Sequence, residues 1–170
     1  MLNKSQNNLT SIKVIEPATS IQQTIKINNS NGISTFALNR KEVFKAGISS
    51  CFKEKEYNIV SCPTPETHCK VYKLTQYATV FEMFECINSD FSLISFTQAQ
   101  IVEFCKSYLD RIDEAKLILG GTAFFLCKLN DYYFSVYISI LGKGFLACYC
   151  PIGDKNPCDP HYLTHIIVPK

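Results

Sequence analysis

The chain has 170 residues, 46% of them hydrophobic, and a formal net charge of +2 at pH 7. One domain of this length buries about 70% of the surface that its unfolded chain exposes, so folding needs no disulfide or metal. The small net charge argues against a polyanionic partner, and no run approaches the roughly 20 apolar residues of a membrane span.

The start of the chain sets the expected domain limits and location. Residues 1–10 are polar and predict a disordered tail, which leaves residues 11–170 as a single domain. The tail has no apolar core and is therefore not a secretory signal. We expect a cytoplasmic protein, either of the producing cell or of a host.

The first elements predicted along the chain are strands. The Asn31-Gly32 step tolerates positive φ and is typical of a tight turn that joins two strands into a hairpin. The strands predicted before residue 40 cover 11–16, 24–28 and 33–38, the last two forming the hairpin.

A first helix is predicted over 40–52. Asn39 takes the N-cap position, Glu42 follows at capping-box spacing, and apolar residues recur at helical intervals. Gly47 lies in the middle of this helix and costs about 1 kcal/mol relative to alanine. The next predicted elements are strands at 57–62 and 68–74, a helix within 75–87, and a short strand at 91–96.

The helix that begins at Thr97 has the strongest local pattern. Thr97 is the predicted N-cap, Gln100 completes a capping box, and Phe96 and Ile101 occupy the hydrophobic-staple positions. One apolar stripe then continues through Ile112. Such a stripe predicts that the helix covers a sheet.

Three strands joined by tight turns follow this helix. The strand at 132–141 alternates strictly between two side-chain sets, which is typical of a sheet covered on one side. We therefore predict an α+β fold with a mainly antiparallel sheet that ends in a three-stranded meander, and two or three helices packed on it. The predicted strands cover 122–129, 132–141, 145–150 and 165–168.

Nine cysteines are an odd number in a chain without an export signal, so we expect reduced thiols rather than a disulfide framework. Free cysteine packs as a small hydrophobe. We expect Cys86, Cys105 and Cys127 to face the core.

A Cys/His group near the carboxyl end is the strongest metal candidate. Zinc takes four nitrogen or sulfur ligands, and the spacing here has the right residue types but no C-x2-C knuckle. Cα atoms two apart on a strand are roughly 6.6 Å apart, whereas two sulfurs on one zinc must come within about 4 Å. Cys148 and Cys150 can therefore share a zinc ion only if their strand bends. The predicted ligands are Cys148, Cys150, Cys158 and His161.

One enzymatic interpretation, a cysteine-dependent enzyme, stays open. A thiol nucleophile needs a histidine base, and either Cys51, or Cys62 with His68, is the candidate, with Asp159 and His161 as remote partners. No residue is assigned as catalytic, and an enzyme is the less favoured interpretation. No glycine-rich loop precedes a helix, so no nucleotide cofactor is expected.

The alternation of strand 132–141 suggests a recognition surface. Tyr133, Ser135 and Tyr137 share one face of the strand, and tyrosine gives large contact area at low entropy cost. A second helix covering this face is the competing interpretation. We predict a small non-enzymatic binding or regulatory protein that acts through a protein partner, as phage or host-interaction proteins do, and not through nucleic acid or a membrane.

The alternatives are a zinc module, in which residues 40–55 contact nucleic acid, and a cysteine-dependent enzyme. Residues 1–60 carry eight basic against four acidic side chains, among them Arg40, Lys41 and Lys45. A solvated mixed-charge surface is the simpler interpretation of this excess, and an anion-binding patch is the other.

Overall fold

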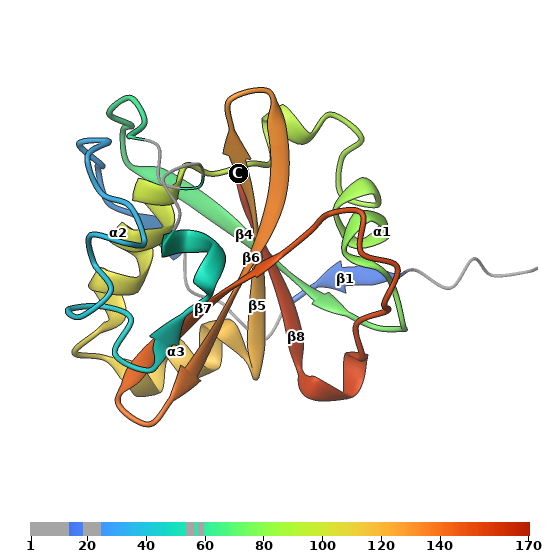
Figure 1. The fold of residues 1–170 in the computed structure, drawn as a ribbon. Helices are drawn as coiled ribbons and strands as arrows, with labels where there is room; N and C mark the ends of the chain where they lie inside the picture. The colour runs from blue at the N-terminus through green and yellow to red at the C-terminus, as the bar shows by residue number, and fades with distance from the viewer. Residues whose placement is uncertain (1–13, 19–24, 54–56, 58–59) are drawn as a thin grey trace, which may run out of the picture.

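The computed structural model describes residues 14–18, 25–53, 57 and 60–170. Within these residues the chain forms one sheet of eight strands, flanked by three α-helices (Figure 1). The strand order is β1-β4-β8-β5-β6-β7-β3, and β2 also pairs with β4. The strands are β1 (Ile15–Pro17), β2 (Ile25–Ile27), β3 (Gly47–Ile48), β4 (Thr67–Leu74), β5 (Thr122–Leu129), β6 (Tyr132–Leu141), β7 (Gly144–Cys150) and β8 (Thr164–Pro169).

The predicted α+β class is confirmed, but the sheet is larger and more mixed than predicted. Neighbours β5, β6 and β7 pair antiparallel in sequence order. The sheet does not end with them, because β3 adds parallel to β7, and β8 lies parallel to β5 and antiparallel to β4. Local periodicity predicts that a segment is a strand, but it does not predict which distant strand becomes its neighbour.

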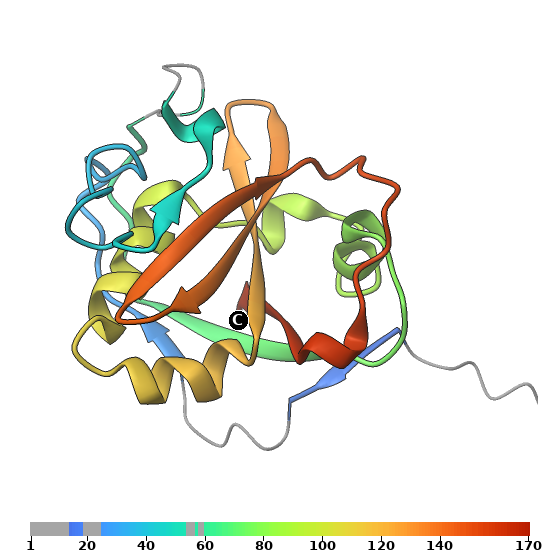
Figure 2. The ribbon, with the colours of Figure 1, turned by 60° about the horizontal axis from the view of Figure 1, so that its bottom comes forward.

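Both faces of the sheet are covered. Helices α2 (Gln98–Tyr108) and α3 (Ile112–Leu119) pack on one face, where Phe125 and Val136 join the larger core cluster. Helix α1 (Val80–Glu85) lies on the other face (Figure 2). Its buried residues belong to the same core cluster as Phe124 and Leu126. Alternate residues of β5 therefore enter two different cores, which explains why this strand is apolar almost throughout.

Helix α2 begins as predicted. The Thr97 hydroxyl accepts a hydrogen bond from the Gln100 amide at 3.2 Å, and the Gln100 side chain accepts one from the Thr97 amide at 2.9 Å. The apolar stripe does not belong to a single helix, however. The backbone leaves the helix at Arg111 (φ −128°), and α3 continues the stripe in a new direction.

Helix α1 confirms the helix predicted within 75–87. Thr79 and Glu82 form a second reciprocal capping box at its start. Cys86 follows its last turn and is exposed, contrary to prediction, whereas Cys105 and Cys127 are fully buried as predicted. The predicted strand at 91–96 is wrong, because Phe91–Leu93 forms a 3₁₀ turn capped by Asp90.

The helix predicted over 40–52 is wrong. This segment contains turns, the short strand β3 and a 3₁₀ turn at Ser50–Lys53. Gly47 has φ +131°, a backbone conformation that no helix contains. The Asn39 side chain also turns backwards and donates to the Thr35 carbonyl at 2.9 Å instead of capping a following helix.

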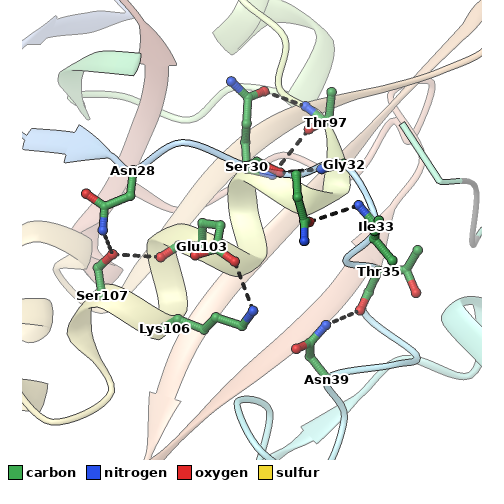
Figure 3. A network of polar contacts seen from close by, with 12 residues as sticks. Asn28, Ser30, Gly32, Ile33, Thr35, Asn39, Thr97, Glu103, Lys106 and Ser107 are labelled. Carbon is green, nitrogen blue, oxygen red and sulfur yellow. Dashed lines mark hydrogen bonds and ion pairs between the residues drawn. The ribbon is translucent and has the colours of Figure 1, made fainter. Parts of the chain in front are cut away.

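The hairpin predicted from 24–28 and 33–38 does not form. Strand β2 pairs with β4, and residues 33–38 contain no strand. Polar contacts hold the segment after β2 against α2, and Asn28 donates to Ser107 at 3.3 Å (Figure 3). Gly32 lies so close to Ser61 that an added Cβ would approach the Ser61 carbonyl oxygen to 2.1 Å.

Some predictions fall on residues outside the described part of the chain. These include the disordered tail over 1–10, residues 11–13 of the first strand, and residues 58–59 of the strand predicted at 57–62. Residues 60–62 are not a strand. Among the described residues, no helix is long and apolar enough to span a bilayer.

Candidate functional site

Three aromatic side chains from different parts of the chain form a row on the α1 side of the sheet. Phe81 of α1 contacts Phe91 with ring centroids 5.8 Å apart, and Phe91 contacts Tyr133 of β6 at the same distance. Both contacts are edge-to-face, the arrangement that aromatic rings prefer. We call Phe81, Phe91 and Tyr133 the aromatic row.

Local sequence explains why this row is open to solvent. The six residues of α1 bury Val80, Met83 and Phe84, which leaves Phe81 on the outer side, 42% exposed. The 3₁₀ turn that carries Phe91 also places Leu93 outward, 63% exposed. The aromatic row is therefore held in place by the buried residues beneath it, while part of its apolar surface faces solvent.

Acidic groups border the row. Glu82 and Glu85 of α1 and Asp90 of the following turn are all exposed. Hydrogen bonds from Thr79 hold the pKa of Glu82 below its ordinary value, and hydrogen bonds from Ser92 do the same for Asp90. Both carboxylates are therefore ionised at neutral pH.

One cation of the chain already uses this surface. Lys128 of β5 lies with Nζ 5.9 Å from the centroid of the Tyr133 ring, and its charge further lowers the pKa of Asp90. This geometry is a cation–π contact. It shows that the ring face of Tyr133 is accessible to a positively charged group.

The predicted Tyr/Ser face divides into three different environments. Tyr133 is half-buried in the aromatic row. Tyr137 is half-buried against Phe124 at 5.6 Å, and a hydrogen bond with Cys148, together with burial, raises its pKa to about 12. Ser135 is fully buried and donates to the Phe125 carbonyl at 3.3 Å, so it contributes no exposed surface.

The four predicted metal ligands do not form one group, although Cys150 and Cys158 lie close enough for the charge of one to affect the other. Cys148 is paired in register with Tyr137, while Cys158 forms backbone hydrogen bonds with Ala78. His161 is exposed in the 3₁₀ turn Pro160–Tyr162. Within the described ranges, no group of three His, Cys, Asp or Glu side chains is arranged to hold a metal ion.

Burial favours the protonated form of some of the thiols. Burial raises the pKa of Cys150 to about 11 and that of Cys69 to about 12. His68 of β4, the predicted base for Cys62, lies with Nε2 3.7 Å from Glu66 Oε1. In the part of the chain that the structure describes, no cysteine thiol is hydrogen-bonded to a histidine.

The basic side chains Arg40, Lys41 and Lys45 surround a shallow depression of about 510 Å³ beside β3. None of the three forms an ion pair with another described residue. Residues 54–55 of the segment predicted to contact nucleic acid, 40–55, lie outside the described residues.

Sequence reasoning missed Phe81 and Phe91 as surface residues. The helix predicted within 75–87 had no defined start, so its outer side was not assigned, and Phe91 belonged to a segment predicted as a strand. The Thr79-x-x-Glu82 capping box was the available signal, because it fixes the helix start and hence the outer side of α1.

Comparisons with known proteins leave the geometry as the basis for a functional assignment. No family model, curated protein or solved structure matches the chain.

Proposed function

We propose that this is a non-enzymatic binding protein that recognises a protein partner through the aromatic row. The observation that carries the proposal is the exposure of Phe81, 42%, while its ring is packed on Phe91 and through it on Tyr133. Rings held in place by packing lose little further entropy on binding, and buried aromatic anchors dominate many interfaces.

The charge around the row indicates the chemistry of the partner. Glu82, Glu85 and Asp90 make its border acidic, and Tyr133 accepts the cation of Lys128 on its face. An arginine side chain can satisfy a carboxylate and stack on an aromatic ring at once. The partner therefore presents a segment with arginine and an apolar anchor, and arginine displaces Lys128 from Tyr133.

The test compares variants of the whole chain. Phe81→Ala combined with Tyr133→Ala removes both ends of the row, whereas Leu117→Ala removes a side chain that is 75% exposed on α3, over the opposite face of the sheet. Tagged forms of the native protein and of both variants are used to capture partners from the same lysate, and their melting temperatures are measured in parallel.

We expect a near-stoichiometric partner that is retained by Leu117→Ala and lost by the double variant, although all three proteins are folded. Retention of the partner by the folded double variant would contradict the proposal. Salt should weaken the interaction, because part of it is electrostatic and exposed.

A further inference from the structure

The charged side chains of residues 40–45 are separated by sign in the folded chain. Arg40, Lys41 and Lys45 all line the depression beside β3, which we call the basic depression. Glu42 lies among them in the sequence, but it does not line the depression and forms no ion pair with another described residue. Every charged residue that lines the basic depression is therefore a cation.

The backbone beneath these cations is anchored to the sheet. The Ala46 amide donates to the Phe145 carbonyl at 3.2 Å, and the Ser49 amide donates to the Ala147 carbonyl at 2.8 Å. Phe44, which also lines the depression, is 1% exposed and belongs to the larger core cluster. The cations therefore extend from a fixed base, and only their side chains lose freedom when a ligand binds.

The side chains of the basic depression indicate the chemistry of its ligand. Neighbouring cations without counter-ions repel one another, and an anion with several charges removes this repulsion when it binds. A guanidinium donates two parallel hydrogen bonds to a phosphate, and an ammonium acts as a compact point charge. A triphosphate chain offers one phosphate group to each of the three cations, Arg40, Lys41 and Lys45.

The extent of the basic depression favours a small ligand over nucleic acid. Proteins that bind nucleic acid carry basic residues along a stripe or over a strongly basic face. Here the net charge of the chain is +2, and the cations of the depression come from residues 40–45 alone. The volume of about 510 Å³ lies within the range of small-molecule sites, about 300–1,000 Å³.

We propose that the basic depression binds the polyphosphate chain of a small molecule, either free inorganic triphosphate or a nucleoside triphosphate. Arg40 binds one phosphate group through two parallel hydrogen bonds, and Lys41 and Lys45 neutralise the other two. This site is separate from the aromatic row, none of whose residues lines it. The double variant of the aromatic row should therefore bind triphosphate as tightly as the native protein.

The test measures affinities of the full chain by isothermal titration calorimetry, without divalent cations and at constant ionic strength. The probes are inorganic triphosphate, orthophosphate, ATP and a short oligothymidylate. We expect triphosphate to bind about tenfold more tightly than orthophosphate, because it engages three cations instead of one. Equal affinities for triphosphate and ATP would support recognition of the phosphate chain alone, and tighter binding of ATP would support a nucleoside triphosphate. Tightest binding of the oligothymidylate would overturn the proposal.

Charge-matched variants locate the binding. Arg40→Gln combined with Lys45→Gln should weaken triphosphate binding about tenfold. Lys155→Gln combined with Lys170→Gln removes the same formal charge from two other exposed positions, and it should change the affinity less than about twofold because solvent and salt screen distant charges. Equal weakening by the two double variants would show that only the total charge matters and would overturn the site.

Backbone amide shifts in NMR spectra provide a second readout of the place of binding. Triphosphate should shift the amides of Gly47 and Ile48, which line the basic depression, and leave that of Gly153, in the turn after β7, unchanged. Absence of triphosphate binding, or a shift at Gly153 as large as that at Gly47, would overturn the proposal.

Discussion

The ring of Phe91 meets the ring of Tyr133 edge-on, with centroids 5.8 Å apart and planes at 80°. This contact joins the 3₁₀ turn after α1 to the first part of β6. Since Phe81 also packs on Phe91, the aromatic row links α1 and the turn that follows it to the distant strand β6.

Phe91→Ala should remove both ring contacts of the row. Because Phe91 is half-buried, we expect a loss of about 2 kcal/mol in the free energy of unfolding, below the cost for a fully buried phenylalanine. A double-mutant cycle with Tyr133→Ala, measured by urea unfolding, should give a coupling of about 0.5–1.5 kcal/mol. Strict additivity would show that the two rings do not interact.

Thr97→Ala should destabilise the protein by about 1 kcal/mol, because the Thr97 hydroxyl caps the Gln100 amide of α2. Ser89→Ala, at an exposed position of the turn after α1, serves as the control and should change stability by less than about 0.5 kcal/mol. Urea midpoints measure both. Equal effects of the two substitutions would mean that the cap contributes nothing.

Gly47→Ala should destabilise the protein by about 1–3 kcal/mol, because φ +131° is strained for any residue with a Cβ. Gly153→Ala is the matched control: its added Cβ meets nothing within 4 Å, and its φ is not positive. If residues 40–52 formed a helix, Gly47→Ala would instead stabilise the chain by about 1 kcal/mol. The sign of the change in thermal unfolding therefore distinguishes the two structures.

Alkaline pH should destabilise the fold through its buried thiols. Burial raises the pKa of Cys150 from its ordinary value of 9.0 to about 11, and that of Cys69 to about 12. The folded state holds these protons more tightly than the unfolded state, so the stability they contribute is complete below pH 9 and declines as the pH rises toward 11 and 12.

Melting temperatures measured from pH 8 to pH 11 test this dependence. Cys150→Ala removes one of the titrating thiols, so its melting temperature should fall less steeply with pH than that of the native protein. Parallel curves for the two proteins would count against a raised pKa at Cys150.

The sequence predicts best where a structure is determined by neighbours in the chain. The Thr97–Gln100 capping box needs only four consecutive residues, and α2 begins where that box predicts. Strands β5 and β6 have the predicted bounds, because a two-residue turn and strict alternation determine both of them.

The pairing of strands that are distant in the sequence cannot be predicted from local residue patterns. Strand β8 lies between β4 and β5, and β2 pairs with β4 instead of forming a local hairpin. Asn39 and Glu42 have the spacing of a capping box, but they do not begin a helix. The Asn39 side chain instead donates a hydrogen bond to the carbonyl of Thr35, four residues earlier. The candidate site shows the same limit of local patterns. Alternation along β6 predicts that Tyr133 and Ser135 form one exposed surface, but Ser135 is fully buried whereas Tyr133 is half-buried.

Photo-crosslinking from the position of Phe81 tests directly whether the aromatic row contacts the partner. A benzophenone-bearing phenylalanine analogue is placed at 81 in one protein and at 117 in another, and both are irradiated in the lysate that yields the partner. We expect one dominant adduct from position 81, with the crosslinked peptide of the partner containing arginine, and no such adduct from position 117. No adduct from position 81, or the same adducts from both positions, would contradict this expectation.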